Sequence, residues 1–289
     1  MDHTKNITAH IHFKMSRLAV IMCPMKKYIS AVLICLPLFF SLLTAAQDHK
    51  EQKRKPDFLS IRVFHFGSNE QEKILDDYLE HALLPGLHNN KFGLVGVFKP
   101  LANDTATDKR IYVITSAGSL EKLITINSIL LNDTSYNNAG RSFLNAAYDH
   151  PSFSRYETIL LQAFSMAKKL EVPVLSSPKS EHIYELRSYE GPTDGLYKNK
   201  VQMFNEGGEV ALFKRLGFNA VFYGEVISGS YMPNLMYMTS FESKEQRDAH
   251  WKTFGADPEW KKLSGLPEYQ HNVSKSDIIL MQAAPYSDY

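Results

Sequence analysis

Hydrophobic and polar positions alternate in eight short stretches of this chain, and stretches with helical spacing lie between some of them. Alternation with a period of two predicts strands, whereas apolar residues that recur every three or four positions predict helices. The predicted strands span residues 59–66, 92–98, 110–117, 156–164, 182–189, 217–227, 234–242 and 277–284. Helical spacing follows the first, third, fifth and seventh strands, so the order β-α-β-β-α-β occurs twice.

This order is typical of the ferredoxin-like unit, whose four-stranded antiparallel sheet carries both helices on one face and leaves the other face open. Two open faces can cover each other and close into a barrel, and a tandem repeat supplies both sheets within one chain. We therefore expect an α+β fold with two tandem ferredoxin-like units, over residues 59–170 and 182–289. Residues 171–181, rich in Pro and Ser, are the expected linker, and residues 47–58 are an expected flexible leader.

Local signals mark helix boundaries in the second unit. Ser243-Lys-Glu-Gln246 has the capping-box pattern, in which the serine side chain accepts an early backbone N–H. Asp257 followed by Pro258 predicts a second helix start, with the proline at the first helical position. Gly207-Gly208 interrupts a helical stretch and predicts a kink or a helix break.

The first 46 residues are expected to lie outside the folded body. Met25-Lys26-Lys27 precedes the apolar run YISAVLICLPLFFSLLTAA, and together they have the basic, apolar and small-residue regions of a secretory signal peptide. We predict cleavage after Ala46, a periplasmic or secreted location, and no membrane span in the mature protein. An uncleaved membrane anchor is the alternative, because the apolar run nears the length that spans a bilayer. Residues 1–24 do not resemble a signal peptide, so a start at Met25 rather than Met1 also stays open.

Composition narrows the functional classes. The 289 residues are 44% hydrophobic with a formal net charge of +1, which gives no reason to expect a nucleic-acid partner. Both cysteines, Cys23 and Cys35, precede the predicted cleavage site, so the mature protein would lack thiols and disulfides. The sequence contains no Gly-rich phosphate loop, G-x-S-x-G, H-E-x-x-H or EF-hand pattern, so hydrolases, kinases and metalloproteases lack support. We predict no cofactor and no metal site.

Several short segments, in a fixed order, resemble the NIPSNAP family. The segments are ELRSY, LFKRLGF, YGEV, SFESKEQRDAHW and ADPEWKKL in the second unit, and YLEHALLPGLH and GLVGVFKP in the first. The resemblance covers residues 59–286 and implies a dimeric-α/β-barrel-like body. Together with free sheet edges, it also favours a homodimer. It implies little about function, because the family is mostly uncharacterised. The wider superfamily includes cofactor-independent monooxygenases and haem-degrading enzymes, which is an analogy of fold only.

Glu185 and Arg187 are the first candidate ligand-binding residues. They lie two positions apart in a predicted strand, so their side chains share one face. Inside a barrel, Arg187 would orient an anionic group and Glu185 would serve as a base or as its partner; a structural ion pair is the alternative. Alignment of the first strands of the two units places Val63 opposite Glu185 and His65 opposite Arg187, so the first unit lacks this charged pair.

Tyr223, Glu225 and His250 complete the candidate set. Tyr223 and Glu225 share a strand face, and with the charged pair they would form an amphipathic pocket for a small aromatic or carboxylate ligand. The alternative is that the strand aromatics build the barrel core. His250 could hold a haem iron, but the sequence offers no second ligand at metal spacing, and a packing role is favoured. The sequence does not fix which face of each strand points inward.

These observations favour the binding of a small molecule or a protein partner in or around the barrel. The first alternative is a cofactor-independent or haem-type monooxygenase acting on a small hydrophobic or aromatic substrate, in which Glu185, Arg187, Tyr223 and His250 position the substrate and manage protons. The second is a purely structural interaction module. An enzyme requires polar groups that converge on an enclosed cavity, whereas a binder requires only the cavity. Catalysis and ligand identity therefore stay open.

Overall fold

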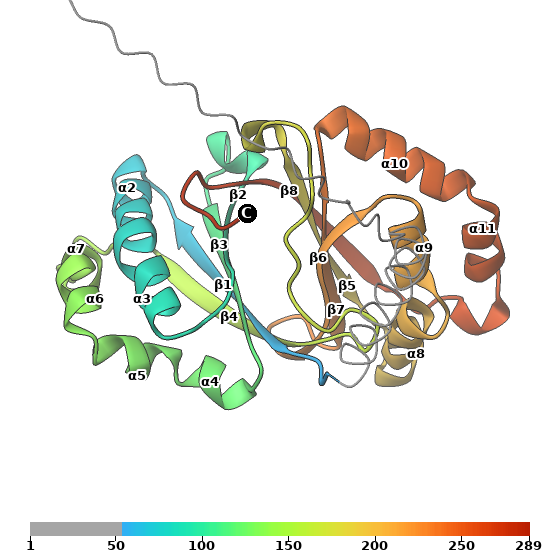
Figure 1. Cartoon of the computed structure of the whole chain (residues 1–289), viewed down its shortest axis with the longest axis horizontal. Helices are drawn as coiled ribbons and strands as arrows, with labels where there is room; N and C mark the ends of the chain where they lie inside the picture. Colours follow the sequence, from blue (N-terminus) through green and yellow to red (C-terminus); the bar gives the residue numbers. More distant parts are fainter. Residues whose placement is uncertain (1–53) are drawn as a thin grey trace, which may run out of the picture. The chain divides into compact units, whose positions relative to one another are not determined.

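Eight antiparallel strands close into a barrel, and helices flank it on two sides (Figure 1). The computed structural model describes residues 54–289, and residues 55–289 form one unit. The predicted signal peptide and its cleavage site lie outside the described residues. The strands are β1 (Phe58–Phe66), β2 (Val95–Pro100), β3 (Lys109–Ala117), β4 (Arg155–Ala163), β5 (Ile183–Glu190), β6 (Asn219–Ser228), β7 (Asn234–Phe241) and β8 (Lys275–Ala283). All eight predicted strands are confirmed, with small shifts at their ends.

The strand order around the barrel is β1-β3-β2-β8-β5-β7-β6-β4. Each half of the chain contributes four neighbouring strands, and two seams, β2–β8 and β4–β6, join the halves. The seams are short, because three residue pairs join β2 to β8 and four join β4 to β6, whereas nine pairs join β1 to β3. Pairing ends at Pro100 in the first seam and at Ser228 in the second. The two half-sheets therefore diverge at one end of the barrel.

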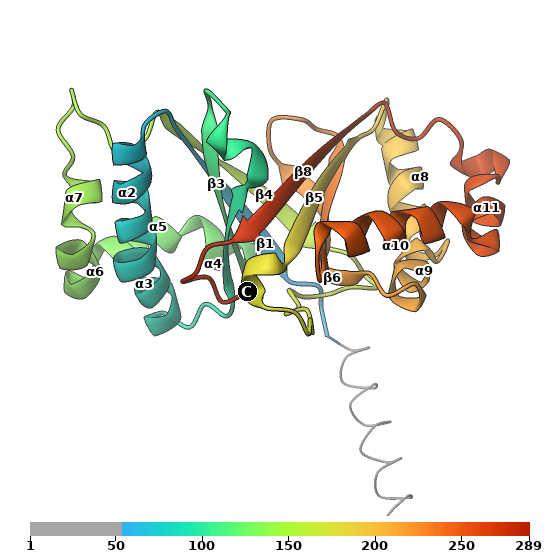
Figure 2. The same ribbon diagram turned by 90° about the horizontal axis from the view of Figure 1, so that it is seen from above.

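The first half carries a long, interrupted helix between β1 and β2. Helices α2 (Asn69–Tyr78), η1 (Leu79–Leu83) and α3 (Leu84–Asn89) follow one another directly along the outer side of the sheet (Figure 2). The η1 segment is a π-helical turn, in which the Leu84 N–H donates to the Leu79 carbonyl. Pro85 explains this turn, because proline has no N–H and its ring crowds the carbonyl four residues earlier.

Short helices follow β3 and β2. Four of them connect β3 to β4, namely α4 (Leu120–Ile124), α5 (Ile126–Leu131), α6 (Thr134–Ala139) and α7 (Arg141–Leu144). The sequence pattern predicts one helix over residues 119–131, where the structure has two, and it does not predict α6 or α7. A 3-10 turn, η2 (Leu101–Asp104), follows β2, and another, η3 (Lys179–Glu181), precedes β5.

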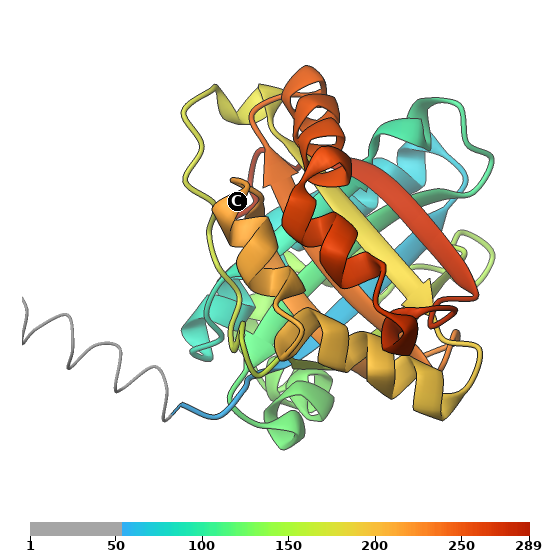
Figure 3. The same cartoon turned by 90° about the vertical axis from the view of Figure 1, so that its right-hand side faces the viewer.

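Four helices cover the outer face of the second half-sheet (Figure 3). They are α8 (Asp194–Asn205), α9 (Glu209–Arg215), α10 (Lys244–Ala256) and α11 (Pro258–Ser264), and a 3-10 turn, η4 (Pro267–Tyr269), follows them. Ser243 caps α10 by accepting from the Gln246 N–H, and Asp257 caps α11. Gly208 separates α8 from α9 with φ 91°, a left-handed conformation that favours glycine, so the predicted helix break is confirmed.

Buried side chains form three layers. One fills the barrel and draws on both halves, and the other two lie between each half-sheet and its helices. Along β1, Ile61 and Val63 belong to the barrel layer, whereas Phe64 and Phe66 pack toward the helices. This alternation follows from the two-residue period of a strand. Within residues 54–289, no helix is both long and apolar enough to cross a bilayer.

Truncation of a barrel-facing side chain tests the barrel layer. Met238, on β7, is 0% exposed, so Met238→Ala should lower the free energy of unfolding by about 2–5 kcal/mol, because it removes buried apolar atoms and leaves a cavity. Met166 is 62% exposed, and Met166→Ala is the matched control with an expected change within about 0.5 kcal/mol. Urea unfolding measures both. Equal effects of the two substitutions would contradict the assignment of Met238 to the core.

Candidate functional site

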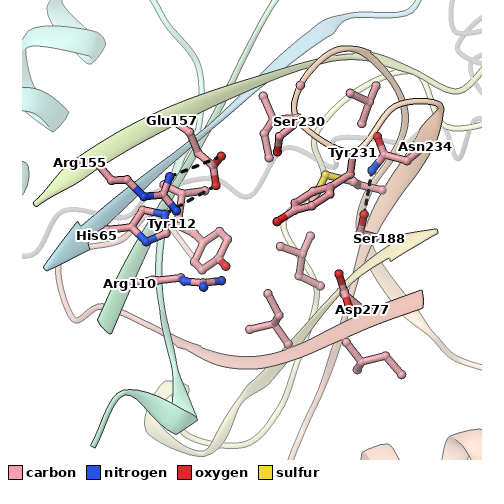
Figure 4. Close-up of a pocket in the computed structure, with 18 residues that line it drawn as sticks. His65, Arg110, Tyr112, Arg155, Glu157, Ser188, Ser230, Tyr231, Asn234 and Asp277 are labelled. Atoms are coloured by element: carbon pink, nitrogen blue, oxygen red, sulfur yellow. Dashed lines mark hydrogen bonds and ion pairs between the residues drawn. The ribbon is translucent and has the colours of Figure 1, made fainter. Parts of the chain in front are cut away.

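A cavity of about 380 Å³ occupies the end of the barrel where the half-sheets diverge (Figure 4). Side chains from every strand except β2 line this cavity, together with the loop after β6. We call it the mouth pocket. Its size falls within the range of small-molecule sites, which run from about 300 to 1,000 Å³.

His65, on β1, is the most unusual residue of the mouth pocket. Its side chain is 1% exposed, and its Nδ1 lies 2.8 and 3.0 Å from the two carboxylate oxygens of Asp108. Its Nε2 has no hydrogen-bond partner among the described residues and lies 3.6 Å from Glu157 Oε1. A buried polar atom without a partner costs about 1–3 kcal/mol, so such atoms are rare unless a ligand uses them.

Two arginines stand beside this histidine. Arg110 donates to Asp108 through Nε at 3.1 Å and Nη2 at 2.9 Å, and Arg155 lies 3.9 Å from Glu157. Partial burial alone would raise the pKa of Asp108, but hydrogen bonds from His65 and Arg110 outweigh it and hold that pKa below its ordinary value. Asp108 is therefore a carboxylate at neutral pH, and it can only accept hydrogen bonds.

The opposite wall is mostly apolar, with the carboxylate of Asp277 and one hydrogen-bonded polar pair. Asn234 donates from Nδ2 to Ser188 Oγ at 2.8 Å, while its buried Oδ1 has no partner among the described residues. Tyr231, on the loop between β6 and β7, leans toward the cavity from the same side (Figure 4). The apolar lining of this wall consists of Leu186, Val226, Met236, Ile278 and Ile279, and the first half adds Val63 and Ile159.

Strand register relates the two walls position by position. His65 pairs with Arg110 on β3 and with Arg155 on β4. Ser188, at the corresponding place on β5, pairs with Met236 and Asp277. The first half thus supplies the imidazole and the guanidinium groups of the pocket. At the equivalent positions the second half supplies smaller or more apolar side chains. The pocket is amphipathic because the two halves differ at equivalent positions.

Glu185 and Arg187 do not face this pocket. Tyr184 and Leu186 belong to the barrel layer, so the alternation of β5 turns Glu185 and Arg187 toward the helices. Arg187 Nε donates to Glu185 Oε1 at 2.5 Å, and Arg247 Nε, on α10, donates to Glu185 Oε2 at 2.6 Å. Trp251 Nε1 also donates to Oε2 at 2.9 Å, and its ring lies 3.7 Å from the Arg187 guanidinium carbon. The pair is part of a satisfied network under α10.

The alignment of Val63 with Glu185 is wrong by one residue. Val63 points into the barrel and Glu185 points out of it, whereas Val63 and Leu186 share the barrel layer. A shift of one residue exchanges the two faces of a strand, and alternation alone cannot detect it. The correct counterpart of His65 is Ser188, because both line the mouth pocket.

The other three candidates also lie on the helix side of the second half-sheet. Tyr223 is buried in the layer between this sheet and its helices. Glu225 accepts from the Tyr197 hydroxyl at 3.2 Å and from Lys198. His250 Nδ1 lies 3.0 Å from the Leu216 carbonyl oxygen. The structure therefore brings Glu185 and Arg187 together, but it does not bring the candidate set to one cavity.

Several residues of the mouth pocket show the same sequence pattern as Glu185 and Arg187, although they are not among the predicted site residues. Arg110 and Tyr112, like Arg155 and Glu157, are polar residues two positions apart on a strand. Their positions near the open ends of β3 and β4 are visible only once the strands are assembled. Among residues 54–289, no group of three or more His, Cys, Asp or Glu side chains could hold a metal ion.

The second half of the chain matches a known family. Residues 184–288 match the NIPSNAP family model. The match begins within β5 and ends after β8, so it covers the half that contains the Glu185 network. No curated protein matches the chain.

Solved structures resemble the whole barrel. A candidate monooxygenase from Lactobacillus acidophilus superposes with a TM-score of 0.52 at 12% identity, over 79% of this chain and 94% of that one. A candidate monooxygenase from Fusobacterium nucleatum gives 0.52 at 8% identity, over 79% and 93%. An anthrone oxidase-like protein gives 0.50 at 10% identity, over 80% and 92%. At such low identities the likeness shows the fold alone.

Removal of the Glu185 carboxylate should destabilise the fold, because its arginine partners lose a counter-charge. Glu185→Gln leaves the half-buried guanidinium of Arg187 without its anion, while Arg247 keeps Asp248, so we expect a loss of about 3 kcal/mol in the free energy of unfolding at pH 7. Glu190→Gln, on the same strand, removes a more exposed pair with Lys275 and should cost about 1 kcal/mol or less. Urea unfolding of both variants measures the difference.

The same variant predicts a pH dependence. Burial opposes ionisation of Glu185, but Arg247, Arg187 and Trp251 outweigh it and lower its pKa below the ordinary value of 4.5. A lowered folded-state pKa contributes stability that is complete above the unfolded-state pKa and is lost as pH falls through the folded-state pKa. The gap between wild type and Glu185→Gln should therefore be constant near pH 7 and shrink below pH 4.5. A gap that widened on acidification would contradict this assignment.

Proposed function

We propose that this protein binds a small organic molecule in the mouth pocket, with an apolar body and a polar head. The observation that carries the proposal is the buried, unpartnered Nε2 of His65 at the wall of a cavity of about 380 Å³. Asn234 Oδ1, on the opposite wall, is a second buried atom without a partner among the described residues. A ligand with complementary polar groups would satisfy both atoms.

The two unlike walls also favour a defined orientation of the ligand. The polar head would lie toward the first half, where His65, Arg110 and Arg155 gather. The apolar body would lie against Leu186 and Met236 of the second half. Sites of this kind combine hydrophobic lining with a few convergent polar groups.

A monooxygenase acting on a small hydrophobic or aromatic substrate is the second proposal. The fold shared with the two candidate monooxygenases supports it, and so does the His65–Asp108 pair, which has the arrangement of a base held by a carboxylate. The groups available for such chemistry are those of the mouth pocket rather than Glu185, Arg187, Tyr223 and His250.

We also propose that the barrel consists of two tandem ferredoxin-like units, and that the protein is exported. The repeated element order and the four neighbouring strands of each half support the first proposal. The basic, apolar and small-residue regions before Gln47 support the second. A homodimer stays a prediction; the barrel itself closes within one chain, so a dimer would use another surface.

The anionic fluorophore 1-anilinonaphthalene-8-sulfonate tests the pocket as a binding site. Its aromatic body and sulfonate match the two walls, so one bound molecule per chain should give enhanced fluorescence. Ser188→Trp would fill the pocket and weaken binding about tenfold or more, which corresponds to about 1.4 kcal/mol. Ser276→Trp places the same side chain at an exposed position of β8 and should leave binding unchanged. Equal binding by both variants, or none by the wild type, would overturn the proposal.

Export predicts a new N-terminus. Expression of the full chain in a bacterium, followed by periplasmic extraction and N-terminal sequencing, should give a protein that begins at Gln47. The matched variant is Ala46→Lys, which should block cleavage because the site requires small residues. Recovery of an intact N-terminus in the cytoplasm would contradict export.

A further inference from the structure

We propose that the mouth pocket selects small molecules with a weakly acidic O–H group, such as phenols or enols, and that His65 takes up their proton so that they bind as anions. This inference rests on the proposed small-molecule function and specifies its chemistry. Asp108 acts as a positioning residue, and Arg110 and Tyr112 lie where they can stabilise the anion.

The tautomer of His65 follows from its contacts. Asp108 is an ionised carboxylate, which accepts hydrogen bonds but cannot donate them. At 2.8 and 3.0 Å from its oxygens, Nδ1 must therefore carry a proton. In the neutral imidazole, Nε2 is then the acceptor, and its lone pair lies at the wall of the pocket.

Carboxylates and cations surround His65 at the mouth pocket. Each nearby carboxylate lies beside a cation: Asp108 beside Arg110, Glu157 beside Arg155, and Asp277 beside Lys275, which also contacts Glu190. Tyr112, from β3, and Tyr231, from the loop after β6, are further titratable groups on this cavity. Uptake of a proton by His65 therefore adds a positive charge beside these carboxylates.

The imidazolium formed in this way would have a carboxylate near each of its two nitrogens. It would lie between Asp108, bound to Nδ1, and Glu157, whose Oε1 is 3.6 Å from Nε2. The ligand oxygen would face the guanidinium of Arg110 and the hydroxyl of Tyr112 (Figure 4). Burial raises the pKa of Tyr112, so its hydroxyl keeps its proton and can donate to the anion.

The step is a proton transfer and needs no other reactant. The ligand O–H bond breaks, an N–H bond forms at Nε2, and the electron pair stays on the ligand oxygen. A carboxylic acid arrives already ionised at neutral pH and has no use for this acceptor. A weak acid gains from it, because both the imidazolium and the anion find counter-charges in the pocket.

4-Nitrophenol tests the inference, because its phenolate absorbs visible light and its neutral form does not. With protein in excess, a pH titration of the bound probe should give an apparent pKa lowered by about one unit or more, which is a tenfold or greater preference for the anion. 4-Nitroanisole has the same body but no proton to give, so it should bind without this pH dependence.

Three variants separate proton uptake from mere binding. His65→Gln should abolish most of the pKa shift of the probe while leaving its body bound. Asp108→Asn should also reduce the shift, because an amide can donate to Nδ1 and move the imidazole proton to Nε2. His81→Gln, at an exposed histidine of η1, is the control that should keep the wild-type shift. Circular dichroism confirms folding, and Asp108→Asn, whose side chain is 49% exposed, replaces His65→Gln if that variant does not fold.

The outcomes are distinct. A lowered pKa in the wild type and His81→Gln, lost in His65→Gln, supports proton uptake by His65. Binding of both probes with an unshifted phenol, or an unchanged shift in His65→Gln, overturns this inference but leaves small-molecule binding in place. Failure of both probes to bind, while 1-anilinonaphthalene-8-sulfonate binds, overturns the inference for this class of ligand. If none of the three probes binds to the wild-type protein, the proposed function is overturned as well.

Discussion

The shortness of the two seams between the half-sheets determines where this barrel is filled and where it is open. Three residue pairs join β2 to β8 and four join β4 to β6, so each half-sheet is joined to its partner over only part of its length. Beyond Pro100 and Ser228 the walls diverge, and the inward side chains cannot meet across the gap. The mouth pocket is the result.

The same separation of layers distinguishes two polar clusters that look alike in the sequence. The Glu185 network lies between sheet and helix, and its carboxylate receives hydrogen bonds from three side chains. Such a group stabilises the packing of α10 and is already occupied by protein donors. His65 lies on the other side of the barrel wall, where one of its nitrogens is left over. An unsatisfied buried atom costs stability. Of the five such side-chain atoms in residues 54–289, only those of His65 and Asn234 belong to residues that line the mouth pocket.

The sequence predicted the strands well because alternation is a local property of each segment. It could not predict the inward face, because alternation is unchanged when both faces are exchanged, and this is how Val63 came to be aligned with Glu185 rather than with Leu186. Helices α6 and α7 were missed because they are single short turns held by contacts with the rest of the first half. His65, Arg110 and Arg155 are far apart in the sequence, and only strand register brings them together.

The union of both halves in one chain has a consequence for how such a site can change. In a barrel made from two identical subunits, every substitution would occur twice, and both walls of the mouth would carry the same residue. Here a histidine on β1 stands at the position equivalent to a serine on β5, and an arginine on β3 at the position equivalent to a methionine on β7. A substitution can therefore change the residues of one wall without changing those of the other. Selection can change the polar groups of one wall while the apolar side chains of the other wall stay as they are.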